Sequence, residues 1–309
     1  MKQFRHSLFS VVMAFTLWVP SMVAAEEPLD LYPGPLGSLG LVTYYTHVTG
    51  NELYTDGSKR SDDFNVAADI GVFRGVYYGM FWNIRTCTNI IVPFGSSSVD
   101  TTAPASGVPF DVHMASPTGL GDIILNSGAY LFYDEKTLLC LPVSFYITAP
   151  TGEYDKDKTL NMSSNRWAFK PSIGLARGIG SKGTIVEALA QAEFYTKNDK
   201  YGAAGAEQKK DALFTFQLML TQFLDPQTFI SADYFYESGG GTELDSVRQD
   251  DKTETQALQF AMARMITSTT QVMFRYRSDF KVENGSRNET FQVRIAYLVP
   301  DFGNKSAAE

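Results

Sequence analysis

Apolar and polar residues alternate with a period of two along most of the chain. In the segment nearest the C-terminus, apolar residues occupy every second position, at Phe291, Val293, Ile295 and Tyr297. The polar residues Gln292 and Arg294 lie between them. The same alternation recurs around residues 272–277, 214–221, 186–194, 139–148 and 64–72. This period is typical of a β-strand whose two faces meet different environments. The pattern therefore predicts an all-β fold.

The alternating segments are too long for strands of a soluble protein, which usually have about five or six residues. A tilted strand needs about 9–11 residues to cross a bilayer. The pattern predicts about twelve such strands, near residues 39–48, 62–75, 82–94, 121–133, 137–149, 166–177, 183–196, 210–223, 227–238, 253–266, 270–281 and 288–298.

The connections between these segments alternate between short and long. Asp134-Glu135-Lys136 is short and residues 150–165 form a long connection, while Asp225-Pro226 is short and residues 238–251 are long. Outer-membrane barrels have short periplasmic turns, longer external loops and an even number of strands. An open sheet edge is not tolerated in hydrocarbon, because no water satisfies its N–H and C=O groups. We therefore predict a closed antiparallel transmembrane β-barrel in a Gram-negative outer membrane.

The N-terminus has the features of a secretory signal peptide. Lys2 and Arg5 precede an apolar run from Leu8 to Val19, and Val23-Ala24-Ala25 supplies the small residues of a cleavage site. The run is shorter than the about 20 residues of a spanning helix. We expect residues 1–25 to be a signal peptide and residues 26–309 to form a single barrel domain.

Composition excludes several classes of function. The formal charge of −8 makes nucleic-acid binding a poor hypothesis. Cys87 and Cys140 fall in predicted strands that are separated by another strand, so we expect free thiols and no disulfide. No metal-ligand spacing or phosphate-binding glycine loop occurs, and we expect no cofactor.

Three short motifs carry a family resemblance. Gly119-Leu120-Gly121-Asp122 opens a strand, the run from Ala149 to Asp155 reads APTGEYD at the end of the next outgoing strand, and Asn165-Arg166-Trp167 begins the following one. With this order and spacing, the chain resembles the outer-membrane transporters assigned to the phenol meta-cleavage pathway, the "phenol degradation protein meta" family, from about Tyr44 to Val299. The resemblance implies a barrel associated with catabolism of aromatic compounds and a role in uptake.

The same motifs also have a purely structural interpretation. Gly119 and Gly121 permit a tight entry into a strand, and the Asp122 carboxylate can cap exposed amides there. Pro150-Thr151-Gly152 is typical of a turn that leaves the membrane.

The inward parity of the predicted strands collects charged and aromatic residues. The candidates for lumen or solute contact are Asp69, Glu187, Asp233, Arg275, Arg277, Arg294, Tyr130, Phe132 and Tyr146. Such a lumen can hold a hydrated path or a salt-bridge plug, and its aromatic rings can contact an apolar solute. The three arginines repel one another unless an anionic solute, or acids such as Asp279, compensate their charge.

Three functions remain open at this stage. The first is a channel for uptake of small hydrophobic or aromatic compounds, with outer-membrane lipid and the solute as partners. The second is an outer-membrane hydrolase, for which His47 and His113 are the histidines outside the signal peptide, but no nucleophile-elbow pattern accompanies them. The third is a structural or adhesive barrel without transport. We expect a channel and no enzyme activity.

Overall fold

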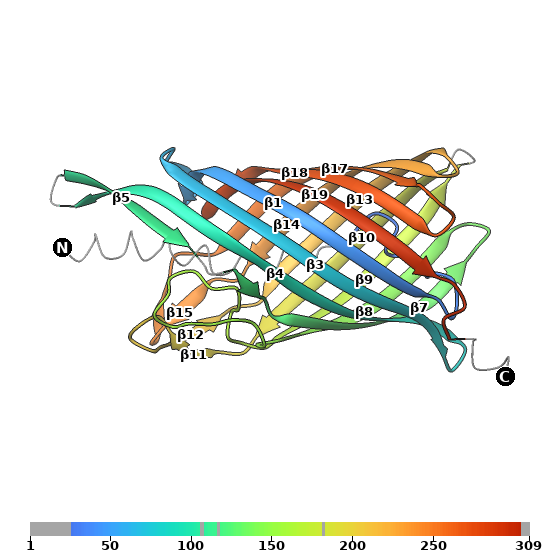
Figure 1. Ribbon diagram of the computed structural model, residues 1–309, viewed down its shortest axis with the longest axis horizontal. Helices are drawn as coiled ribbons and strands as arrows, with labels where there is room; N and C mark the ends of the chain where they lie inside the picture. Colours follow the sequence, from blue (N-terminus) through green and yellow to red (C-terminus); the bar gives the residue numbers. More distant parts are fainter. Residues whose placement is uncertain (1–25, 106–107, 116–117, 181–182, 304–309) are drawn as a thin grey trace.

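Twelve long antiparallel strands form one closed barrel, as predicted (Figure 1). The computed structural model describes residues 26–303 apart from 106–107, 116–117 and 181–182, so the predicted signal peptide lies outside the described residues and stays a prediction. The barrel strands are β1 (Leu39–Thr55), β3 (Phe64–Phe81), β4 (Ile84–Ala105), β7 (Ile123–Asp134), β8 (Leu139–Ala149), β9 (Ala168–Ile179), β10 (Thr184–Tyr195), β13 (Leu213–Asp225), β14 (Thr228–Gly239), β17 (Thr253–Met265), β18 (Thr270–Val282) and β19 (Gly285–Val299).

Each barrel strand pairs with its neighbour along the chain, and β19 pairs with β1 to close the sheet. The closing ladder runs from Leu39 opposite Val299 to Tyr54 opposite Gly285. Closure pairs the backbone groups that an open sheet edge would expose to hydrocarbon. The described part of the chain contains no helix that is long and apolar enough to span a membrane.

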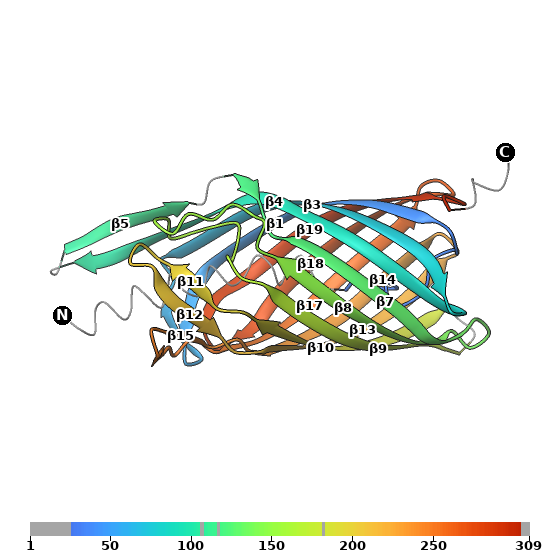
Figure 2. The same ribbon diagram turned by 90° about the horizontal axis from the view of Figure 1, so that it is seen from below.

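The two ends of the barrel differ in the length of their connections. At one end β3 and β4 are joined by Trp82 and Asn83, whose φ angles of 46° and 62° are those of a type I′ turn, which matches strand twist. At the other end lie β2 (Ser58–Ser61), β5 (Val108–Ala115), β6 (Gly119–Leu120) and a second sheet of β11 (Asn198–Tyr201), β12 (Ala206–Lys210), β15 (Thr242–Leu244) and β16 (Val247–Arg248) (Figure 2). By the loop-length rule of outer-membrane barrels, the second end is external.

Strands β1, β3 and β4 are longer than the sequence pattern predicted. The pattern predicts that the first strand ends near residue 48 and the third near residue 94, whereas β1 reaches Thr55 and β4 reaches Ala105. In Figure 1, β4 continues with β5 as a ribbon that projects from the external end. The parts of a strand that extend beyond the bilayer do not contact lipid and need no apolar residue at every second position. The alternation that located the other strands is therefore absent from them.

The outer surface carries the apolar parity of most strands. On β13, Phe214, Phe216, Leu218 and Leu220 are all exposed, while Gln217, Met219 and Thr221 are buried inside. Similar rows of exposed residues occur on β18 and β19. These rows form the lipid-facing surface that the alternation predicted.

The predicted orientation of β3 is wrong. Phe64, Val66, Ala68, Ile70 and Val72 face the barrel interior, so Asp69 points outwards instead of into the lumen. Outside, the Asp69 carboxylate accepts hydrogen bonds from Tyr45 at 2.6 Å and from His47 at 2.8 Å. Both faces of β3 contain apolar residues, and a period of two does not say which parity faces lipid.

Phe132 is also misplaced, for a different reason. The pairing of β7 with β8 shifts register between Tyr130 and Phe132, which is a β-bulge. Tyr130 faces the interior, but after the extra residue Phe132 is half exposed on the outer face and Tyr133 lies opposite Cys140. A bulge inverts the parity of everything that follows it in the strand.

Candidate functional site

The lumen is occupied by the chain segment that precedes β1. This lumen segment, residues 26–38, is tied to the wall at several points along its length. Gln217 of β13 donates to the Glu26 carbonyl at 2.9 Å, the Leu29 amide donates to Glu187 of β10 at 2.8 Å, and Tyr130 of β7 donates to the Tyr32 carbonyl at 3.2 Å. The channel interior is therefore not an open bore but the space that this segment leaves.

Charged residues line the part of the lumen formed by the C-terminal strands. Glu27 of the lumen segment forms ion pairs with Arg275 of β18, at 3.3 Å, and with Arg294 of β19. Arg277 pairs with Asp279 at 3.3 Å and with Glu237 of β14 at 3.7 Å. Acids of the chain itself therefore compensate the three predicted arginines, which is the structural alternative of the sequence analysis.

Apolar residues line the opposite wall, and we call this wall the apolar column. Its deeper part packs Ile70 and Val72 of β3 against Ile91 of β4 and Ile124 of β7, and its external part packs Phe64 and Val66 against Val99. The sequence pattern had placed the β3 side chains in lipid. The column extends from the external end of the barrel to its middle.

A loop folds over the external end of this column. We call residues 150–167, between β8 and β9, the mouth loop. Its Leu160 and Met162 are buried against the column, in its external and deeper parts respectively. The Asp122 carboxylate holds the loop, because it accepts bonds from the Gly152 amide at 3.0 Å, from Ser163 Oγ at 2.6 Å and from the Ser164 amide at 3.0 Å. The aspartate of the GLGD motif thus caps amides, as its structural interpretation predicted.

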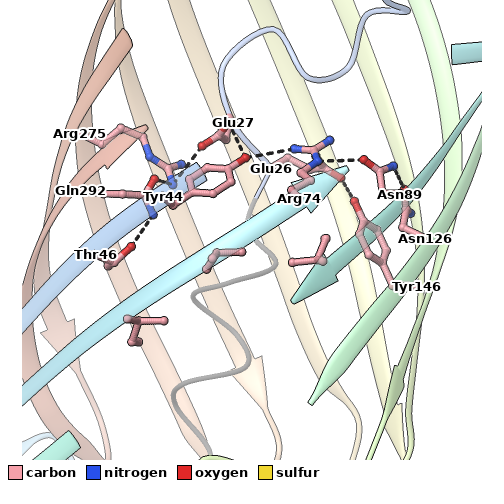
Figure 3. Close-up of a pocket in the computed structure, with 13 residues that line it drawn as sticks. Glu26, Glu27, Tyr44, Thr46, Arg74, Asn89, Asn126, Tyr146, Arg275 and Gln292 are labelled. Atoms are coloured by element: carbon pink, nitrogen blue, oxygen red, sulfur yellow. Dashed lines mark hydrogen bonds and ion pairs between the residues drawn. The ribbon is translucent and has the colours of Figure 1, made fainter. Parts of the chain in front are cut away.

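Two cavities lie in the middle of the barrel. The outer chamber is lined by Ile70, Val72, Ile91, Thr46, Gln292 and Arg275 among others (Figure 3). The inner chamber lies nearer the short β3–β4 turn, with Val76, Tyr78, Cys87, Tyr130 and Leu189 in its wall.

Five residues line both chambers and so mark the partition between them: Glu26, Arg74, Asn89, Asn126 and Tyr146. Arg74 Nε donates to Asn89 Oδ1 at 2.8 Å, and Arg74 Nη1 donates to Asp30 of the lumen segment at 2.7 Å. Asn89 in turn donates to Asn126 at 2.6 Å, and Tyr146 donates to Glu26. Figure 3 shows this row of polar side chains running across β3, β4, β7 and β8.

Seven of the nine predicted lumen residues lie inside the barrel. Arg275 lines the outer chamber, Tyr130 the inner chamber and Tyr146 both, whereas Glu187, Asp233, Arg277 and Arg294 belong to the buried polar network around the lumen segment. Asp69 and Phe132 lie outside, as described above. None of these positions by itself shows contact with a solute.

The sequence analysis missed the residues that organise the partition. Arg74 follows the buried row of β3 at the same parity, so the inverted orientation of that strand hid it. Glu26 and Glu27 had been assigned to no strand and to no role. A signal did exist for Glu27, since three inward arginines require acids close by.

Each histidine considered for the hydrolase hypothesis lies beside an aspartate. His47 lies within β1, on the outer face beside Asp69 and Tyr45, and His113 lies in β5 beside Asp100. The described residues contain no group of three or more acid, histidine or cysteine side chains placed to hold a metal. Cys87 and Cys140 are free thiols, both against the cluster that contains Leu31.

Two solved structures resemble the barrel of this chain. The crystal structure of the COG4313 outer membrane channel from Pseudomonas putida F1 matches with a TM-score of 0.80 and 27% identity, over 89% of this chain and 100% of that one. The transport unit of the Escherichia coli autotransporter AIDA-I matches with a TM-score of 0.55 at 8% identity, over 95% and 98% of the two chains. The latter shows the barrel fold alone. No curated protein matches this chain.

Fold, lumen and structural match together define an outer-membrane channel of the β-barrel class. Residues 49–295 match the family described as "Putative MetA-pathway of phenol degradation". The chain belongs to this family, as the resemblance of its three motifs had indicated.

Proposed function

We propose that this channel admits small, largely apolar aromatic compounds to the periplasm. The observation that carries the proposal is the apolar column, which leads from beneath the mouth loop to the outer chamber. A pore for hydrated ions or sugars would be lined by polar groups along its whole length, whereas this wall offers aliphatic side chains. The description of the family, which refers to phenol degradation, supports the same class of solute.

The lumen segment and the charged side of the lumen support this interpretation in another way. They fill the part of the bore that water and ions would use, and their charges are paired within the chain. A path along the apolar column therefore meets little competition from a hydrated one. We also propose that residues 1–25 are removed on export and that the remaining chain forms one domain.

The test is entry of aromatic solutes into cells of a Gram-negative host that carry this channel. Lipopolysaccharide slows entry of apolar compounds, so radiolabelled phenol and toluene at low concentration should enter several-fold faster than in cells with the empty vector. Arabinose, which is similar in size but polar, should enter at nearly the vector rate.

Two neighbouring isoleucines provide a matched pair of variants. Ile91 lines the outer chamber, while Ile90 is half exposed on the lipid-facing surface. Ile91→Trp should fill the chamber and slow entry of both aromatics, and Ile90→Trp should leave entry unchanged. Entry of arabinose that exceeds entry of the aromatics would contradict the proposal, and vector rates for all three solutes would favour a structural barrel.

A further inference from the structure

Arg74 lies in the partition between the outer and the inner chamber. It lines both, and its guanidinium joins the barrel wall to the lumen segment, since it bonds Asn89 of β4 and Asp30 of that segment. Its side chain is only 16% exposed. Passage along this wall therefore requires that at least one hydrogen bond of Arg74 be exchanged.

The exchange has a chemical requirement. The loss of a hydrogen bond destabilises a buried guanidinium more than a neutral group, because a buried charged donor without a partner bears the full cost of desolvation. A solute that carries an oxygen acceptor can replace Asn89 as the partner of Arg74 while it passes. A hydrocarbon of the same size cannot, and it leaves the guanidinium unsatisfied.

A second arginine prepares the solute for this exchange. Arg275 is 7% exposed and lines the outer chamber, and its Nε and Nη1 have no hydrogen-bond partner among the residues that the structure describes. Opposite it stand Ile70, Val72 and Ile91 of the apolar column. The chamber thus combines a surface for an aromatic ring with buried donors for an oxygen.

The lumen segment itself need not leave for this route to operate. Besides its bonds to Arg74 and Tyr146 in the partition, it is held at Glu187 of β10, Gln217 of β13, Arg275 of β18, Arg294 of β19 and Tyr130 of β7, and these anchors can persist while a bond of Arg74 is exchanged. We propose that Arg74 is the specificity-determining residue of the channel, which selects small aromatic solutes with an oxygen acceptor, and that these solutes pass beside a stationary lumen segment. This inference rests on the function proposed above.

The first experiment compares phenol with toluene, which differ in the acceptor rather than in the ring. Arg74→Met should slow entry of phenol about tenfold, since one charge-assisted hydrogen bond corresponds to roughly one order of magnitude. Entry of toluene should be unchanged or faster, because the unsatisfied guanidinium is gone. Arg74→Lys, which keeps a donor, should restore part of the phenol rate.

Two further variants keep this experiment decisive. Arg74→Met leaves Asp30 without its cation, so the double variant Arg74→Met with Asp30→Asn removes the same donor without leaving that carboxylate unpaired. Arg85→Gln, which removes a cation of the same wall outside both chambers, should leave both rates unchanged. Equal loss of phenol and toluene entry in the double variant would overturn the role of Arg74 in selection. Absence of any entry through the unaltered channel would instead refute the proposed function.

The second experiment fixes the lumen segment. Leu31 packs in the same buried cluster as Cys140, so Leu31→Cys in a Cys87→Ser background introduces a second thiol into that cluster, and mass spectrometry reports whether oxidation joins the two in a disulfide. Phenol entry should be retained after oxidation and unaffected by a reductant. Entry that is lost on oxidation and returns on reduction would show that the segment must move, and would overturn the stationary route.

Discussion

Lys210 shows how strongly the external sheet can alter a single ionisable group. It lies at the end of β12, half-buried, with its Nζ 4.2 Å from the centre of the Tyr195 ring. Burial lowers the pKa of Lys210 to about 8, and the nearby carboxylate of Glu193 only partly opposes this change. A cation at this position is favourable over the ring but costs desolvation energy.

Lys210 should titrate separately from the other lysines. Its pKa in the folded protein lies below the unfolded value of about 10.4, so the unfolded state binds more protons between these two limits. The external sheet should therefore become more stable as the pH rises from about 8 towards 10. The ¹³C shift of dimethylated lysines, followed by NMR, should give a midpoint near 8 for Lys210.

Lys197 is the control for this titration, because a hydrogen bond to Glu207 raises its pKa. Its midpoint should lie above that of an ordinary lysine. A common midpoint for Lys197 and Lys210 would show that the external sheet does not bury Lys210.

At the residue scale, the sequence located the interior only where the polar and apolar parities were distinct. Arg275, Arg277 and Arg294 were predicted inside because the residues between them are plainly lipophilic. Asp69 was predicted inside by the same rule, although Tyr45 and His47 stabilise it outside. Arg74 was missed, since its role depends on partners from β4 and the lumen segment that no local pattern brings together.

At the scale of elements, the carboxylate of Asp122 holds several points of the mouth loop, in addition to the bonds of Tyr154, Asn165 and Arg166 to the external sheet. Both oxygens of Asp122 are used, Oδ1 by Gly152 and Ser163 and Oδ2 by the amide and hydroxyl of Ser164. Leu160 and Met162 then reach the apolar column. The short GLGD motif therefore determines the position of a loop that lies about thirty to forty residues further along the chain.

Asp122→Asn should loosen the mouth loop. The amide nitrogen that replaces Oδ2 cannot accept from Ser164, so two hydrogen bonds are lost and the open form of the loop becomes more populated, by about tenfold for each 1.4 kcal/mol. Trypsin added to intact cells should then cut faster after Lys156 or Lys158, both of which are exposed.

Asp250→Asn, in another external connection, serves as the control and should leave the cleavage rate unchanged. An Asp122→Asn channel that is cut as slowly as the parent would show that the other contacts of the loop, such as burial of Leu160 and Met162 and the bonds of Tyr154 and Asn165, are enough to hold it.

The strands themselves were predicted well, because length, alternation and connection length all followed from the bilayer. Two local features broke the rule. The bulge after Tyr130 inserts one residue into β7 and so exchanges the inner and outer faces of the residues that follow, and nothing in the composition marks it. In β3, the side chains of the apolar column face the interior of the barrel instead of the lipid. A bilayer favours apolar residues outside a barrel, but it does not exclude them from the inside.

At the scale of the whole molecule, the proposed route predicts that stability and transport depend on different sides of the lumen. The charged side joins the lumen segment to β18 and β19 through Glu27, and joins β14 to β18 through Arg277. The apolar column lies along β3, β4 and β7, and the chambers extend from it to the lumen segment, with Arg275 and Gln292 in the lining of the outer one. Apart from Arg275, which belongs to both sides, substitutions on the charged side should therefore change the stability of the barrel, and those along the column and chambers should change its flux.

Arg277 provides the test of this division, since it lies outside the linings of both chambers. Arg277→Gln leaves the carboxylates of Asp279 and Glu237 buried without their cation, and breaking a buried pair in this way costs about 3–5 kcal/mol. The temperature at which the barrel loses its folded mobility on gels should fall, while ion selectivity in planar bilayers and entry of phenol per folded channel stay unchanged.

The double variant Arg277→Gln with Asp279→Asn should recover part of the loss of stability, because the two residues are coupled. Lys281→Gln, in the same strand but in an exposed pair with Glu254, should change neither quantity. If Arg277→Gln instead lowered anion preference without a change in melting temperature, the arginines would belong to the path of the solute, and the division of the lumen into a structural and a conducting side would be wrong.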